Sequence, residues 1–355
     1  MFSEIGSDFF DYSYDEHRTT EFWWEDFQYN VCYLKSGRNA IKAFCQSIRD
    51  GKKSVLIPIY TCETVIKPFI DEGWEINYYL VNRDLSIDEA SLSQNYRCKQ
   101  PSVVFVQTYF GFNTVGNSKC ILECQNNGAI IVEDLTQSLF SNHHIERADY
   151  YVTSFRKFFA IPDGGALISN NRFDLNISEA NKQIVSVALE AYNLKRKYFQ
   201  SGIASEKVVF REKYAELHSL IAENEQIQSI SALSDDIIHG CDQGTIKSLR
   251  RINYRVIDEF CTQLEMICPV MPSLTDGCTP LYYPIYVNNR RELQNYLSSK
   301  NIFCPVIWPK PAVLNDIDEN TKYMYEHMLC IPIDQRYSYE DMKRIGLTLK
   351  EYYQK

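Results

Sequence analysis

The sequence predicts an α/β fold, with a mostly parallel sheet in a large domain and a smaller α/β domain at the C-terminal end. Short apolar runs alternate with helical patterns from about residue 36 to residue 170. Several of these runs are continuously apolar, as in a sheet that helices cover on both faces. The 355 residues exceed one small core and suit a large domain with a smaller one.

The first 30 residues are rich in aromatic side chains without a clean period. We expect an arm there that packs on the body or on a partner subunit. A helix is expected to begin at Ser36-Gly37, because Ile41, Phe44 and Ile48 then share one face. Further helices or loops are expected at Cys62–Asp71, Lys119–Gln125, Ser178–Gln200, Glu206–Glu223, Gly244–Glu265, Arg290–Ser299 and from Tyr339 to about Tyr353.

Strand-like runs lie between these segments and return in the last quarter of the chain. The expected division is an arm (1–30), a large domain (31–240), a connecting helix (241–265) and a small domain (266–355). The expected strands are Ser54–Ile57, Ile76–Leu80, Val103–Gln107, Ala129–Glu133, Tyr150–Ser154, Ala166–Ser169, Tyr282–Val287 and runs around Phe303–Ile307 and Leu329–Ile331.

The composition argues against several classes of protein. A net charge of −9 disfavours general nucleic-acid binding, which needs a basic face. No run approaches the roughly eighteen apolar residues of a membrane span, and the start lacks the plan of a signal peptide, so we expect a cytoplasmic protein. The twelve cysteines are scattered, without a CxxC pair or zinc spacing, so reduced thiols and no metal are expected.

Two reactive side chains follow buried strands. Asp134 comes directly after the run Ala129–Glu133, and Lys157 lies shortly after Tyr150–Ser154. A lysine that forms a Schiff base and an acid that partners the pyridinium nitrogen are what a pyridoxal phosphate (PLP) enzyme needs. The alternatives are an Asp134 that caps the next helix and a Lys157 that is a solvated loop residue.

Other polar residues are placed where they could hold the rest of such a cofactor. The turn Ser36-Gly37-Arg38 precedes a helix, so its backbone N–H groups could face a phosphate, although such a turn is more often only an N-cap. The Ser154 hydroxyl could bind the same phosphate. Gln137, three residues after Asp134, could reach the phenolic oxygen of the ring.

In their order along the chain, these motifs resemble the DegT/DnrJ/EryC1/StrS family of PLP-dependent sugar aminotransferases, a branch of the fold type I transferases. The resemblance covers most of residues 30–355 and is strongest between 129 and 169. The motifs are the Ser36-Gly37 turn, strand runs followed by Pro58 and by Tyr109-Phe110-Gly111, then Glu133-Asp134-x-x-Gln137, Ser154-Phe155, Lys157 and Gly164-Gly165.

The resemblance implies a homodimer with active sites shared across the interface. It also implies transfer of an amino group from glutamate to a nucleotide-linked keto sugar, in amino-sugar or polysaccharide biosynthesis. The matched positions are the Schiff-base lysine (Lys157), the acid at the pyridine nitrogen (Asp134), its following glutamine (Gln137), the phosphate serine (Ser154), the phosphate turn (Gly37 and Arg38) and, near the ring-stacking position, Cys62.

Four departures place the chain in a divergent branch. Ser154 and Lys157 are two residues closer than in the family's SFxxxK, Pro162-Asp163-Gly164-Gly165 replaces GEGG, and the third residue of the phosphate turn is an arginine. The family's phosphate-binding asparagine is missing from the segment 230–234. Two alternatives therefore stay open: a PLP-dependent sugar dehydratase, and a non-catalytic descendant that binds a sugar nucleotide or regulates a partner.

Five side chains are candidates for contacts with the substrate or with anionic groups. Arg38, Arg156 and Arg336 could bind a carboxylate or a diphosphate, or could be surface or structural arginines. Tyr109 and Trp308 are aromatic residues that could line the pocket or belong to the core.

Overall fold

The structure is a computed structural model that describes residues 4–18, 20–27, 29–48, 51–145, 148–223, 225–271 and 273–354. Its main sheet has seven strands in the order β1-β7-β6-β5-β4-β2-β3. These are β1 (Asn30–Leu34), β2 (Ser54–Pro58), β3 (Glu75–Tyr79), β4 (Val103–Gln107), β5 (Ile130–Asp134), β6 (Tyr150–Thr153) and β7 (Gly165–Ser169). Strands β2 to β6 run parallel, whereas β7 is antiparallel to both β1 and β6. The predicted mostly parallel α/β sheet is confirmed.

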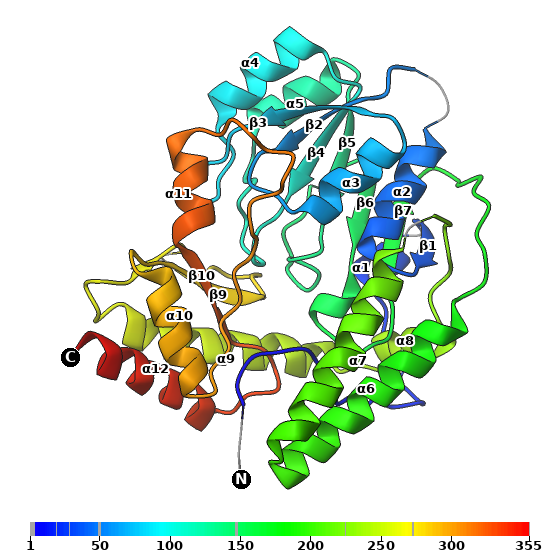
Figure 1. Cartoon of the computed structure of the whole chain (residues 1–355). Coiled ribbons are helices and arrows are strands. Elements are labelled where there is room, and N and C mark those ends of the chain that lie inside the picture. Colours follow the sequence, from blue (N-terminus) through cyan, green and yellow to red (C-terminus); the bar gives the residue numbers. More distant parts are fainter. Residues whose placement is uncertain are drawn as a thin grey trace.

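Helices cover both faces of this sheet (Figure 1). Side chains such as Val55 and Ile57 pack on one face against α2 and α3, and Leu56, between them, packs on the other.

The helices are α1 (Trp23–Asp26), α2 (Gly37–Ser47), α3 (Glu63–Asp71), α4 (Glu89–Lys99), α5 (Lys119–Asn126), the 3₁₀ turn η1 (Phe155–Lys157), α6 (Lys182–Ser201), α7 (Ala204–Ala222), α8 (Ala232–His239), α9 (Gln243–Cys261), α10 (Arg290–Ser299), α11 (Glu319–His327) and α12 (Tyr339–Tyr353).

A second, smaller sheet lies in the C-terminal part of the chain (Figure 1). Its antiparallel strands are β8 (Cys268–Pro269), β9 (Tyr282–Tyr286) and β10 (Met328–Pro332), in the order β10-β9-β8. Helices α9 and α12 pack against each other beside it. The predicted return to strands and helices after residue 265 is confirmed, while the domain boundaries stay a prediction.

Helices α6 and α7 form a long antiparallel hairpin along one side of the molecule (Figure 1). Gly202 ends α6 in the left-handed conformation, at a φ of 69°, which glycine adopts without strain. The hairpin has its own apolar core, and Phe10 and Tyr12 of the N-terminal arm pack against it.

The described part of the arm packs on its own chain. Ile5 pairs with Ile302, and Phe303 N–H donates to the Ile5 carbonyl at 2.7 Å. The Lys195 ammonium of α6 donates to the Ser7 hydroxyl at 2.9 Å. The arm therefore links the hairpin to the C-terminal part of the molecule.

One predicted strand is wrong, and several elements were not predicted. Residues 303–307 form no strand, because Phe303 pairs locally with the arm rather than extending a sheet. Helix α4 was not predicted, because Leu92 is its only fully buried side chain and the helix therefore has no apolar stripe. Strand β1 and helices α1, α8 and α11 were also missed.

The described residues contain neither a membrane-spanning helix nor a cluster of metal ligands. None of the helices there combines the length and the apolar content of a membrane span. Nor does that part of the chain contain three or more His, Cys, Asp or Glu side chains grouped so as to hold a metal ion.

Candidate active site

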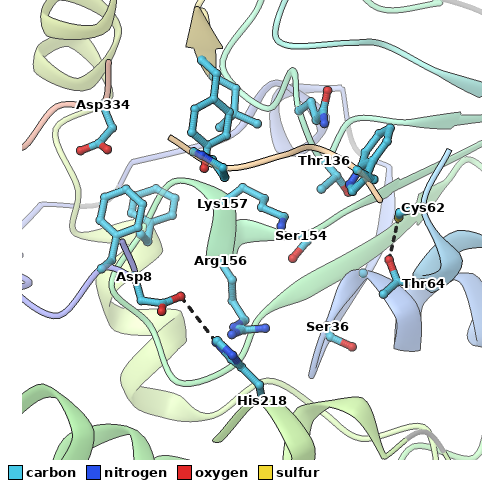
Figure 2. Close-up of a pocket in the computed structure, with 18 of the residues that line it drawn as sticks. Asp8, Ser36, Cys62, Thr64, Thr136, Ser154, Arg156, Lys157, His218 and Asp334 are labelled. Atoms are coloured by element: carbon cyan, nitrogen blue, oxygen red, sulfur yellow. Dashed lines mark hydrogen bonds and ion pairs between the residues drawn. The ribbon is translucent and has the colours of Figure 1, made fainter. Parts of the chain in front are cut away.

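A cavity of about 640 Å³ lies at the carboxyl ends of β4, β5 and β6. This edge of a parallel sheet is where α/β proteins bind their ligands. The walls also come from the start of α2, the arm, the α6–α7 hairpin and the segment around Trp308. Figure 2 shows side chains from these distant parts of the sequence directed into one space.

Lys157 projects into this cavity from η1, directly after β6 (Figure 2). Its side chain is open to the cavity although protein surrounds it on all sides. Among the described residues, none forms a hydrogen bond or an ion pair with its amine. Burial lowers the pKa of Lys157, against the opposing effect of Cys62 and Asp134. The lowered pKa favours the neutral, nucleophilic form of the Lys157 amine, and no polar contact with the described residues occupies this amine.

Asp134 is the last residue of β5 and lines the same cavity. Its carboxylate accepts hydrogen bonds from Thr136 N at 2.9 Å and from Gln107 Nε2 at 3.3 Å. Burial nevertheless raises its pKa. It caps no helix, because residues 136–140 form turns. A buried carboxylate with a raised pKa is a site that a cationic or proton-bearing ligand group would stabilise.

The neighbouring acid, Glu133, points to the opposite face of the sheet and does not line the cavity. Thr108 Oγ1 and Ile145 N each donate to it at 2.7 Å. Burial raises the pKa of Glu133 to about 7. Glu133 therefore serves the interior of the protein, and only Asp134 of this pair faces the cavity.

The turn at the start of α2 is packed tightly against the end of β6 and the start of β7. Ser36 caps the helix, accepting from Asn39 N at 3.2 Å, so the N-cap interpretation is confirmed. A Cβ on Gly37 would lie 3.1 Å from the Ser154 Cβ, and one on Gly165 would lie 2.3 Å from the Ser36 carbonyl carbon. The turn, its backbone N–H groups and the Ser154 hydroxyl thus share one corner of the cavity.

Arg38 lines the cavity, but its guanidinium is directed to the hairpin. Nη1 donates to the Ala222 carbonyl at 2.7 Å, at the end of α7. Its Nε is buried, and none of the described residues accepts a hydrogen bond from it. The side chain ties the turn to α7, which the sequence did not suggest.

Gln137 and Cys62 both line the cavity. Gln137 Oε1 accepts from Phe110 N at 2.8 Å, which leaves its amide N–H₂ group as the donor available to a ligand. The Cys62 sulfur lies 2.8 Å from Thr64 Oγ1, as Figure 2 shows. Burial raises the pKa of the Cys62 thiol, so it is a neutral side chain at the edge of the cavity.

Two of the proposed substrate contacts need correction. Tyr109 lies in the core, 2% exposed, and donates to the Tyr60 carbonyl at 2.7 Å, so it lines no part of the cavity. Arg336 lines the cavity, but it pairs with Asp334 at 2.7 Å and donates to the carbonyl of Ser7 at 3.0 Å. Its guanidinium holds the arm in place and is not available to a substrate. Trp308 does line the cavity.

The walls of the cavity that the arm and the hairpin provide were not predicted from the sequence. Tyr192, Tyr214 and His218 reach the cavity from α6 and α7, and Asp8 reaches it from the arm. Asp8 and His218 form an ion pair at 3.5 Å. Although burial opposes it, this contact lowers the pKa of Asp8 to about 2. No sequence motif marks these residues, because only the docking of the hairpin brings them to the site.

The segment that lacks the family's asparagine has a different task here. Ser231 and Ser234 donate their hydroxyls to the Asp163 carboxylate at 2.7 and 2.6 Å. The Asp163 side chain is fully buried. The replacement of the glutamate in GEGG by this aspartate is thus matched by two serines in the segment 230–234.

The chemistry available here is that of an amine and a buried carboxylate facing one space, with an anion-binding turn beside them. Such a set can capture a carbonyl group covalently and move protons next to it. A ligand with an aldehyde, a basic ring nitrogen and an anionic group would meet a matching group at each position.

Several solved structures with the same fold are described as aminotransferases, some of them as sugar aminotransferases. PseC of Helicobacter pylori, an aminotransferase of pseudoaminic acid biosynthesis, has a TM-score of 0.66 at 12% identity, with 92% of this chain and 87% of that chain covered. DesV of S. venezuelae has a TM-score of 0.64 at 15% identity, covering 92% and 85%. A putative sugar aminotransferase of Streptococcus pneumoniae, Spr1654 in its PLP form, has a TM-score of 0.65 at 15% identity, covering 95% and 92%.

Sequence comparisons give no counterpart to these structural matches. No protein-family model matches the chain, and no curated protein sequence does. The resemblance to the DegT/DnrJ/EryC1/StrS proteins therefore holds at the level of the fold, which is that of the fold type I transferases.

Proposed function

We propose that this chain is a PLP-dependent aminotransferase that moves an amino group from glutamate to a nucleotide-linked keto sugar. The observation that carries the proposal is the pairing of Lys157 and Asp134 in one cavity. The amine has no structural partner among the described residues, and the buried carboxylate has a raised pKa. A protein that only binds sugars has no use for this combination.

The residues of the cavity fit PLP. Lys157 is the one lysine among the described residues that line the cavity. The Asp134 carboxylate accepts hydrogen bonds from Thr136 and Gln107 and has acceptor capacity left for a ring N–H. The α2 turn and the Ser154 hydroxyl would hold the phosphate. Gln137 would donate its free amide N–H to the ring oxygen.

When bound, PLP supplies an aldehyde for an amine and a ring that spreads the negative charge of the reacting carbon. Lys157 would hold the cofactor and, once displaced by the amino donor, would move the proton from the donor's α-carbon to the C4′ carbon of the cofactor. Its lowered pKa favours the neutral amine that both tasks require. Asp134 would keep a proton on the ring nitrogen, and the neutral Cys62 is near the position that, by the resemblance, stacks on the ring.

The substrate side of the proposal rests on the lining of the cavity. Trp308, Tyr192 and Tyr214 offer aromatic surface. The C–H groups of a sugar ring and the base of a nucleotide carrier can pack against such side chains. The proposal includes a cytoplasmic homodimer active in amino-sugar or polysaccharide biosynthesis, which rests on the resemblance to the family.

The test uses wild type and Lys157→Ala, each titrated with PLP and then with glutamate while the visible absorbance is recorded. We expect a yellow band in the wild type only, and its bleaching by glutamate. A band that glutamate leaves unchanged would favour the dehydratase alternative. No band in the wild type, even with excess PLP, would favour the non-catalytic alternative and overturn the proposal.

A further inference from the structure

We propose that Arg156 binds the phosphate group of the cofactor, together with the N-terminus of α2 and the Ser154 hydroxyl. This inference rests on the proposed function and extends it to a residue that supplies affinity rather than chemistry. From the sequence, Arg156 was a candidate for binding a carboxylate or a diphosphate, or a surface or structural arginine.

The first observation is that the Arg156 guanidinium forms no hydrogen bond or ion pair with any acceptor in the part of the chain that the structure describes. The other arginines of the cavity are all engaged with protein acceptors: Arg38 with Ala222, Arg336 with Asp334, and Arg250 with the Leu281 carbonyl at 3.0 Å. Arg156 alone among them offers its full set of donors to a ligand.

The second observation is its position. Arg156 lies two residues after Ser154, whose Cβ closely approaches Gly37 of the α2 turn, and directly before Lys157. In Figure 2 its side chain points away from Lys157, into the part of the cavity where Ser36 and His218 lie. If Lys157 bound one end of a ligand, the other end of that ligand could lie beside Arg156.

The third observation is the charge around the guanidinium. Burial lowers the pKa of Arg156, and so does the neighbouring Arg38, whereas Tyr192, Asp8 and Asp163 raise it. Asp8 is already paired with His218, and Asp163 with two serines. Neither carboxylate forms an ion pair with Arg156 among the described residues, so an additional anion beside the guanidinium would stabilise its positive charge.

A phosphate matches this region better than a single carboxylate does. It carries close to two negative charges and several acceptor oxygens, which the backbone N–H groups of α2, the Ser154 hydroxyl and a forked guanidinium can satisfy together. The donor's carboxylate is the competing ligand for Arg156, and the experiment separates the two.

The experiment compares the dissociation constants of PLP and of pyridoxal, which lacks the phosphate, for wild type and Arg156→Ala. Both compounds can react with Lys157, and loss of the Arg156 charge acts on that amine for both, so the ratio of the two constants is the readout. We expect PLP binding to weaken about 10- to 100-fold, as for loss of a hydrogen bond between charged groups, and pyridoxal binding to change little. Unchanged pyridoxal binding also shows that the variant is folded.

Arg156→Lys should recover part of the PLP affinity, because it restores the charge but not the fork. Arg211→Ala removes the same charge from the exposed face of α7 and should leave both constants unchanged.

Equal weakening of PLP and pyridoxal would overturn the inference, since Arg156 would then act through Lys157 or the fold. An unchanged affinity for PLP with a higher glutamate requirement would overturn it in favour of the donor's carboxylate. Wild type that binds the two compounds equally would contradict a phosphate site and leave the proposed function standing. Wild type that binds neither would overturn both.

Discussion

The alternation of side chains in β5 decides which of two adjacent acids can take part in chemistry. Glu133 and Asp134 are both buried and both have raised pKa values, but they point to opposite faces of the sheet. Only Asp134 meets the cavity that contains Lys157. Because successive side chains of a strand point to opposite faces, Glu133 is a structural carboxylate and Asp134 a candidate catalytic one.

Asp134→Asn tests this assignment. The amide keeps the size of the side chain but cannot hold a proton on the ring nitrogen by its charge. We expect PLP still to bind and the rate of conversion by glutamate to fall by about 100-fold or more. Stopped-flow absorbance after mixing with glutamate measures this rate.

Glu133→Gln is the matched control, because it makes the same change one residue away on the other face. It should lower the stability of the fold and leave the rate nearly unchanged. Equal rates for wild type and Asp134→Asn would remove Asp134 from the mechanism.

At the scale of elements, the sequence predicted those parts whose apolar pattern is complete. The buried runs of β2, β4 and β7 and the amphipathic helix Tyr339–Tyr353 lie within a residue of their predicted bounds. The same reasoning brought Ser36, Gly37, Asp134, Ser154 and Lys157 to one edge of the sheet, where the structure also has them. The local apolar pattern did not predict α4, which buries one side chain fully. It also predicted a strand at residues 303–307, where the structure has none.

Gly165→Ala tests the packing between β7 and the α2 turn. The new methyl group would lie 2.3 Å from the Ser36 carbonyl carbon, so the turn must move. We expect a loss of about 1–3 kcal/mol in the free energy of unfolding and weaker PLP binding, measured by urea denaturation and absorbance titration.

Gly244→Ala is its control, because the added methyl group would make only an ordinary contact, 3.4 Å from Asp242 Oδ1. A Gly165→Ala variant with wild-type stability and PLP affinity would show that the turn is not held by this contact.

His239 connects α8 to α1 through charged hydrogen bonds. Its ring lies 3.3 Å from both Asp235 and Glu25, and these contacts raise its pKa to about 10, against the effect of burial. Because the folded-state pKa lies above the ordinary value of 6.5, its stabilisation is complete below that pH and is lost as the pH rises toward 10.

His239→Gln should therefore cost about 1.5–3 kcal/mol at pH 6 and much less at pH 10, measured by urea denaturation beside wild type. The exposed His17→Gln should change the stability by less than about 0.5 kcal/mol at either pH. A cost for His239→Gln that does not depend on pH would contradict the charged state of the ring.

At the scale of the whole molecule, the arm and the α6–α7 hairpin complete the cavity, and the sequence could not have shown this. Asp8 and His218 are 210 positions apart, and no local pattern links them. Their meeting depends on how the hairpin docks and on the arm that Lys195, Tyr337 and Arg336 hold in place. The domain boundaries at residues 30, 240 and 265 stay a prediction.

Lys195→Met tests the link between arm and hairpin. The ammonium is fully buried, donates to Ser7 and Asp8, and has a pKa that burial lowers to about 7. Because the unfolded chain binds this proton more tightly, the stability that Lys195 confers rises as the pH increases from about 7 to 10.5. The variant should lose about 1–3 kcal/mol, and more at pH 9 than at pH 7, in urea denaturation.

Lys197→Met, on the same helix, removes only an exposed ion pair with Glu206 and should cost less than about 1 kcal/mol. A difference between Lys195→Met and wild type that shrinks as the pH rises would contradict the lowered pKa.

The most direct test of the central claim is to reduce the PLP-treated protein with borohydride and to map the modified peptide by mass spectrometry. Reduction fixes the cofactor to the lysine that holds it. The account predicts a single pyridoxyl group on Lys157 and none in Lys157→Ala. Modification of another lysine, or no stable modification of the wild type, would contradict it.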